Sequence, residues 1–83
     1  MNQDTLSMVV HEIATMMGVP EDSLGPDTSL TEIGVDSLEA LQLLIELERV
    51  TQIQIDEADM KRFTTIGSIV DLLNQRFQEA AAA

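Results

Sequence analysis

The chain has 83 residues, which is the length of one small domain and leaves little room for the deep cleft of a typical metabolic enzyme. Fifteen acidic residues against four basic ones give a formal net charge of −11, which disfavours binding to nucleic acid or anionic membranes and favours basic partners. Cysteine is absent, so the chain supplies no disulfide and no thiolate nucleophile, and no apolar run approaches the roughly 20 residues of a membrane span.

The composition also bears on fold class and location. Apolar residues make up 45% of the chain but only 2% of residues are aromatic, and glycine (4) and proline (2) are scarce, which favours helices over strands. The N-terminal residues are polar and do not resemble a signal peptide. We therefore expect an all-α cytoplasmic monomer that binds no nucleic acid and does not insert into membranes. The acidic charge taken alone is equally compatible with a role in solubility.

The first predicted element is a helix at about 4–17. Asp4 is a suitable N-cap, and Gly18 with Pro20 signals the end of the helix. The apolar residues recur at spacings of three and four and form one stripe, namely Leu6, Val9, Val10, Ile13, Met16 and Met17.

A long connection follows at 19–35, rich in loop formers such as Pro26 and Gly34. Leu24, Leu30 and Ile33 lie within it at wide spacing, and a fully solvated loop has no need of them. We expect these side chains to pin the loop onto the helices. Loops of this length in compact domains are often functional.

The second helix is predicted to start at Asp36 or Ser37 and to end at about Val50. Asp36 is a good N-cap, and Glu39 three residues later is close to the capping-box pattern. A short helical turn is expected at 57–62, with Asp56 as its cap.

The last helix is predicted at about 66–77, with Thr65 as its cap. The sum is an all-α bundle of three main helices plus one short helix, with a long first loop, in a single domain of residues 1–79. The alanine tail at 80–83 is interpreted as a frayed or disordered extension or a cloning remnant. The core stripe of the last helix is predicted to contain Ile66, Ile69, Val70, Leu73 and Phe77.

The second helix is apolar on two faces. Its wide face is expected to enter the core and contains Ala40, Leu43, Leu44, Leu47 and Val50. A narrower stripe of Leu38, Leu41 and Ile45 lies on roughly the opposite side, bordered by Gln42, Glu46 and Glu48. One interpretation is that loop residues cover this stripe. The other is that it stays exposed and, with its acidic border, docks basic partners.

Residues 34–41 have the sequence Gly-Val-Asp-Ser-Leu-Glu-Ala-Leu, which resembles the attachment motif of acyl carrier proteins. Residues 27–34, Asp-Thr-Ser-Leu-Thr-Glu-Ile-Gly, are similar to the loop that leads into that motif in the family. Residues 64–66, Thr-Thr-Ile, are similar to the start of its last helix. The resemblance covers nearly the whole chain and implies a small acyl-carrier-like bundle.

The resemblance implies that Ser37 receives 4′-phosphopantetheine from coenzyme A through a magnesium-dependent phosphopantetheinyl transferase. The terminal thiol would hold acyl intermediates as thioesters for fatty-acid or polyketide biosynthetic enzymes. The chain itself would be no enzyme and would hold no metal. Asp36 would help to engage the transferase and its metal. Partners such as ketosynthases and acyltransferases with basic patches would bind the second helix through Leu38, Glu39, Leu41, Ile45, Glu46 and Glu48.

The physical chemistry of the motif agrees with this resemblance. A serine in the first turn of a helix lies beside unpaired backbone N–H groups, and the helix dipole stabilises a phosphodiester there by about 0.3–1 kcal/mol. Gly34 permits a tight turn before the cap. Because the chain lacks cysteine, the sulfur of a thioester has to arrive on a prosthetic group.

Several alternatives stay open. Fatty-acid-synthesis members of the family often have phenylalanine where Ser29 stands here and another near Thr51, so a polyketide or other specialised acyl pathway is as well supported as fatty-acid synthesis. Aminoacyl and D-alanyl carriers share the fold and the serine, and an acidic helical adaptor without cofactor is the rival from another class. His11 is interpreted as a surface residue. Met60 is interpreted as core filler or as part of an acyl pocket.

Overall fold

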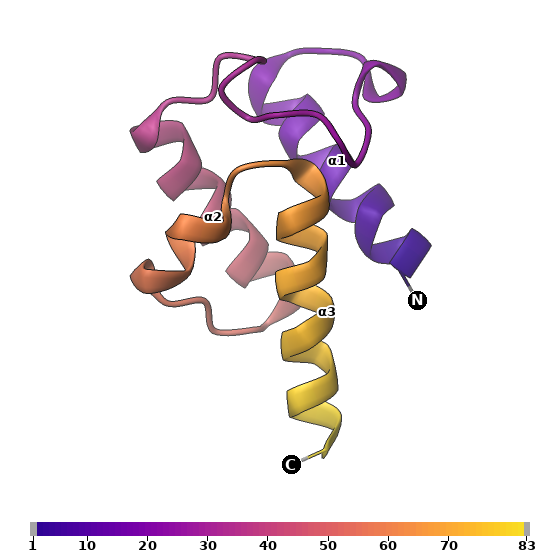
Figure 1. The fold of residues 1–83 in the computed structure, drawn as a ribbon, viewed down its shortest axis with the longest axis vertical. Coiled ribbons are helices and arrows are strands. Elements are labelled where there is room, and N and C mark those ends of the chain that lie inside the picture. The colour runs from indigo at the N-terminus through magenta and orange to yellow at the C-terminus, as the bar shows by residue number, and fades with distance from the viewer. Residues whose placement is uncertain (1, 83) are drawn as a thin grey trace.

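The computed structural model describes residues 2–82, and Figure 1 shows their arrangement. The elements in chain order are α1 (Asn2–Met17), the 3-10 helix η1 (Glu21–Ser23), α2 (Ser37–Thr51), the 3-10 helix η2 (Glu57–Arg62) and α3 (Ile66–Ala82). Three main helices, the short helix at 57–62 and the long first loop are confirmed. None of the helices in residues 2–82 is both long and apolar enough to cross a membrane.

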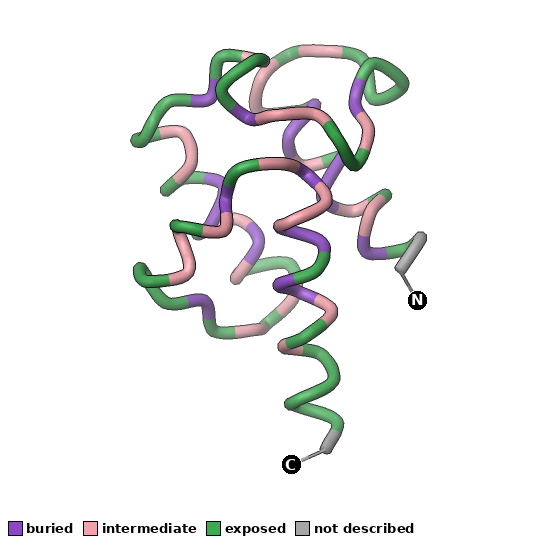
Figure 2. The backbone as a smooth tube through the Cα atoms, in the orientation of Figure 1, coloured by how far each residue is buried: buried purple, intermediate pink, exposed green. Residues whose placement is uncertain are grey.

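Helix α1 packs against both α2 and α3, and η2 bridges α2 and α3. The buried residues of α1, α2, α3 and the connecting loops form one core, and Met60 of η2 packs against it partly buried. Figure 2 marks the buried residues along the backbone. Aliphatic side chains dominate this core, as the composition predicted. Its largest fully buried members are Val9, Ile13, Leu30, Leu43, Leu47, Ile66, Ile69, Leu72 and Leu73.

Helix α1 begins earlier than predicted. Asp4 lies exposed in its first turn, so its assignment as N-cap is wrong. The first turn of α1 contacts α3 through Thr5, which is buried and donates a hydrogen bond to Asn74 Oδ1 at 2.8 Å. The predicted end is confirmed, because Gly18 adopts φ 68° and its N–H and that of Val19 both donate to the Ala14 carbonyl.

The long first loop is pinned as expected, since Leu24 and Leu30 are buried. The loop also contains η1, which was not predicted because a helix of three residues is too short to give a periodic sequence pattern. The loop lies against the start of α3 through backbone hydrogen bonds. Leu30 N donates to Thr64 O at 2.9 Å, and Ile66 N donates to Thr28 O at 3.0 Å. These contacts fix the chain that leads into α2.

Helix α3 begins where Thr65 caps it. Thr65 Oγ1 accepts from Ser68 N and Ser68 Oγ accepts from Thr65 N, each at 3.1 Å. The helix continues to Ala82, beyond the predicted end near 77, and the separation of a domain at 1–79 from an alanine tail stays a prediction.

The prediction of a core position is wrong for two residues. Phe77 and Val50 are both exposed, although the other members of the predicted core stripe of α3 are buried. Each lies near the C-terminal end of a helix, and α3 projects past the rest of the molecule at that end (Figure 1). Periodicity places a residue on a face, but the length of the neighbouring helices decides whether that face is covered.

Candidate functional site

The N-terminus of α2 is fixed by a reciprocal pair of hydrogen bonds. Asp36 is the extended N-cap, and its Oδ1 accepts from Glu39 N at 2.8 Å. Glu39 Oε1 accepts in return from Asp36 N at 3.2 Å. The predicted capping box is therefore confirmed, and it satisfies one of the unpaired N–H groups of the helix start.

The backbone before the cap turns where the sequence predicted. Gly34 adopts φ 87°, a left-handed conformation that favours glycine, and its N–H donates to Thr31 O at 3.1 Å. Val35 is buried and its N–H donates to Leu30 O at 3.0 Å. The turn and the buried valine hold Asp36 and the start of α2 in place.

Ser37 is the first residue of α2 and is exposed. Within residues 2–82 its hydroxyl has no hydrogen-bond partner in the structure, so the oxygen is accessible to an incoming group. It lies at the positive end of the helix dipole, beside N–H groups that no intrahelical acceptor satisfies. This position suits a covalently attached phosphate ester.

An open hollow of about 270 Å³ lies beside Ser37, between the first loop, α2 and η2. Its buried wall is apolar, and Met60 of η2 lies on its edge, which agrees with the interpretation of Met60 as a lining residue. The hollow gives an attached arm an apolar surface next to its attachment point. Its lining consists of Leu30, Thr31, Val35, Asp36, Ser37, Ala40, Met60 and Phe63.

The second apolar face of α2 is exposed, which decides between the two interpretations of this helix. Leu38 is 64% exposed, Leu41 37% and Ile45 56%, so no loop covers them. We call these three residues the docking stripe. The opposite face is in the core, where Leu43 and Leu47 are almost fully buried. That the docking stripe binds partners stays a prediction.

The three glutamates assigned to the partner face all interact within the chain, and of these contacts only the one that Glu39 makes in the capping box was predicted from the sequence. Glu39 belongs to the capping box, and Glu48 Oε2 accepts from Ile55 N at 2.8 Å. Glu46 forms an ion pair with Arg49. The ion pair of Glu46 and Arg49 could also have been found in the sequence, as opposite charges three residues apart on a helix, whereas the contact of Glu48 with Ile55 could not.

His11 is an exposed residue of α1, as predicted, and it interacts with the first loop. Its Nδ1 lies 2.8 Å from Oε2 of Glu21 in η1. This hydrogen bond, with the negative charge of Glu21, raises the pKa of His11 above 6.5. The pair links η1 to α1 on the surface. Among the described residues there is no group of three or more His, Cys, Asp or Glu side chains that could hold a metal ion.

Comparison with known proteins relates the sequence of this chain to a family. Residues 8–73 match the family model described as the phosphopantetheine attachment site. The chain is 30% identical over 78 residues to an acyl carrier protein of Amoebophilus asiaticus, covering 94% of each protein. It is 39% identical over 59 residues to an acyl carrier protein of Onion yellows phytoplasma, covering 70% of this chain and 78% of the relative. It is also 35% identical over 77 residues to the non-reducing polyketide synthase adrD of Penicillium roqueforti, covering 92% of this chain and 3% of that protein.

Proposed function

The chain belongs to the acyl carrier protein family, and on that premise we propose that Ser37 is the residue that carries its 4′-phosphopantetheine. The single observation that carries this proposal is the exposed, unpartnered hydroxyl at the first position of α2. As a family member the protein is a phosphopantetheine-bearing carrier of acyl groups in fatty-acid or polyketide synthesis. When attached, the group supplies the thiol that this cysteine-free chain lacks, and the thiol holds an acyl group as a thioester.

The residues around Ser37 fit such a group. The N-terminus of α2 favours the negative charge of a phosphodiester. The hollow beside the serine offers apolar contacts from Met60 and Phe63. Asp36 uses Oδ1 for the helix cap, and its second carboxylate oxygen has no partner within residues 2–82. We propose that this oxygen approaches the metal of the phosphopantetheinyl transferase during attachment.

The carrier needs a transferase and acyl-processing enzymes as partners. We propose that ketosynthases, acyltransferases and the transferase dock on the stripe through surfaces that are apolar at the centre and basic at the rim. The exposed Leu38 and Ile45 and the net charge of −11 support this proposal. We further propose that the chain performs no catalysis itself and acts as a monomer in the cytoplasm.

Intact-mass measurement tests the attachment site. The chain is incubated with coenzyme A, magnesium and a promiscuous phosphopantetheinyl transferase, and wild type is expected to gain the mass of one phosphopantetheine. Ser37→Ala is expected to stay folded by circular dichroism and to gain nothing. Ser7→Ala, which removes an exposed hydroxyl from α1, serves as the matched control and is expected to be modified like wild type. Modification that persists in Ser37→Ala would show that the site is wrong.

The acyl group is tested separately. Mass spectrometry of protein purified from its native host is expected to show an acyl thioester on the arm. An aminoacyl group there would assign the chain to the aminoacyl or D-alanyl carriers instead. A chain that no transferase modifies would support the acidic adaptor.

A further inference from the structure

The three glutamates of the predicted partner face, Glu39, Glu46 and Glu48, differ in the groups to which they bind. Glu39 and Glu48 accept hydrogen bonds from backbone N–H groups, and neither forms an ion pair within residues 2–82. Glu46 is paired with a cation, because Arg49 reaches it from the next turn of the same helix. The border of the stripe therefore has one position at which the acidic charge is neutralised from within the chain.

The Arg49 guanidinium contacts the Glu46 carboxylate through two of its nitrogens. Arg49 Nε lies 3.0 Å from Glu46 Oε1, and Nη2 of Arg49 contacts the same oxygen. The hydrogen bond raises the pKa of Arg49 and lowers that of Glu46. The negative charge of Glu12 in α1 is a further, smaller cause of the raised pKa of Arg49, and Glu12 and Glu46 line the same hollow of about 240 Å³. Since the Arg49 side chain is 67% exposed, a docking protein meets the pair directly.

We propose that Arg49 is a specificity-determining residue of the docking stripe, because it occupies the Glu46 carboxylate that a basic partner would otherwise bind. This inference rests on the proposed carrier function. An enzyme that places a lysine or arginine against Glu46 has to displace the guanidinium of Arg49 before it gains the contact. An enzyme that relies on the apolar stripe and on the unbalanced Glu39 loses nothing. The pair therefore selects against partners that depend on a cation at this position.

The test is the rate at which a transferase with a basic docking surface modifies Ser37. The value of kcat/KM is measured at low ionic strength for wild type, Arg49→Gln, Glu46→Gln and the double variant. Arg49→Gln is expected to raise kcat/KM by about two- to fivefold, the scale of exposed ion pairs. Glu46→Gln is expected to lower kcat/KM by a similar factor in the Arg49→Gln background and to have a smaller effect in wild type. Both effects are expected to shrink with added salt.

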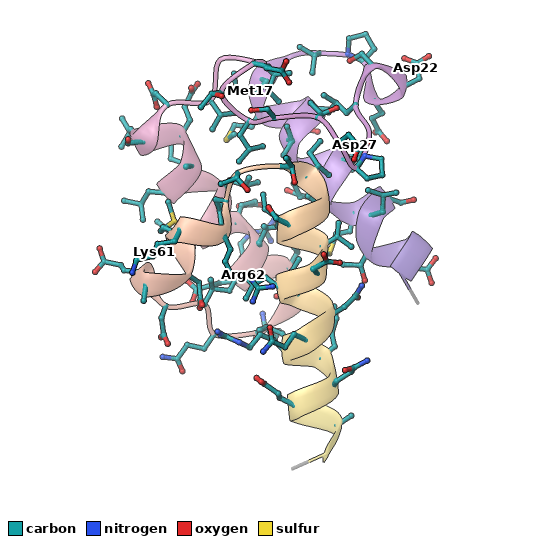
Figure 3. All side chains as sticks on the ribbon, viewed as in Figure 1. Met17, Asp22, Asp27, Lys61 and Arg62 are labelled. Carbon is teal, nitrogen blue, oxygen red and sulfur yellow. The ribbon has the colours of Figure 1, made fainter. Side chains whose placement is uncertain are left out.

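The matched control is Lys61→Gln, which removes the same charge from η2. Lys61 is exposed at the outer edge of η2 and has no ion pair within residues 2–82 (Figure 3). An equal acceleration by Lys61→Gln would show that net charge sets the rate, and an equal loss from Glu46→Gln in both backgrounds would show that Arg49 does not compete. Either result overturns this inference while Ser37 is still modified. Failure of every variant to be modified would overturn the proposed function as well.

Discussion

Asp59 of η2 and Arg76 of α3 form a two-point ion pair, in which Nη2 of the arginine lies 2.8 Å from Oδ1 and 2.9 Å from Oδ2 of the aspartate. Both side chains are largely shielded from solvent, at 24% exposed for Arg76 and 14% for Asp59. Arg76 Nη1 also donates to Gln54 O at 3.3 Å, just before η2. One α3 side chain thus holds the short helix that provides Met60 to the hollow beside Ser37.

The Asp59 and Arg76 pair is expected to contribute measurably to stability. Arg76→Gln should lower the free energy of unfolding by about 1–3 kcal/mol, because it leaves a partly buried carboxylate without its charged donor. Urea unfolding followed by circular dichroism measures this change. Arg62→Gln is the matched control, since the hydrogen bond from Arg62 to Gln75 is exposed, and its effect should stay within about 0.5 kcal/mol. Equal effects of the two variants would contradict a specific contribution of the Asp59 and Arg76 ion pair to stability.

Gly67→Ala is expected to destabilise the protein although alanine is the better helix former. A Cβ on Gly67 would lie 2.9 Å from the carbonyl oxygen of Pro26, which accepts the Gly67 N–H at 2.8 Å. The first loop must move away, and its hydrogen bonds to α3 weaken. We expect a loss of about 1–2 kcal/mol after the gain in helix propensity of about 1 kcal/mol is included.

Gly25→Ala is the control for this experiment. A Cβ there meets nothing within 4 Å, so the free energy of unfolding is expected to change by less than about 0.5 kcal/mol. A stabilised Gly67→Ala variant would show that the loop yields without cost.

Local signals predicted the start of α2 and the existence of its second apolar stripe. Asp36 and Glu39 form a capping box within four residues of sequence, and Gly34 marks a turn by its identity alone. Helical periodicity predicted the second stripe but left open whether a loop covers it, and only the structure shows that it is exposed. The serine at the helix start is exposed for the same local reasons.

Contacts between distant segments could not be predicted in this way. The first turn of α1 depends on Thr5 and Asn74, which are brought together only by the packing of α1 on α3. The close approach of Pro26 to Gly67 and the use of Glu48 to hold Ile55 depend likewise on tertiary structure. Such tertiary contacts also determine which of the glutamates predicted to bind partners are already hydrogen-bonded within the chain.

The His11 and Glu21 pair is expected to give a small pH dependence. The folded pKa of His11 lies above its usual value of 6.5, so its contribution to stability is complete below about pH 6.5 and is lost as pH rises through the folded pKa. An NMR titration of the imidazole should show the raised pKa. In Glu21→Gln the value should return toward 6.5, whereas Asp22→Asn, which removes a neighbouring charge without a bond to His11, should leave it raised. An unchanged titration in Glu21→Gln would rule out this pair in solution.

Ile45 and Leu47 are expected to separate docking from folding, because they lie on opposite faces of α2. Leu47 is fully buried, so Leu47→Ala should lower the free energy of unfolding by about 2–5 kcal/mol. Ile45 is 56% exposed, so Ile45→Ala should change stability by less than about 0.5 kcal/mol, with the better helix propensity of alanine offsetting the lost contacts. If the stripe docks partners, Ile45→Ala should nevertheless lower kcat/KM for Ser37 modification by about fivefold or more, the scale of an interface hot spot. Unfolding in urea and the modification rate are measured on the same samples, and an Ile45→Ala variant modified as fast as wild type would contradict docking of the transferase on this stripe.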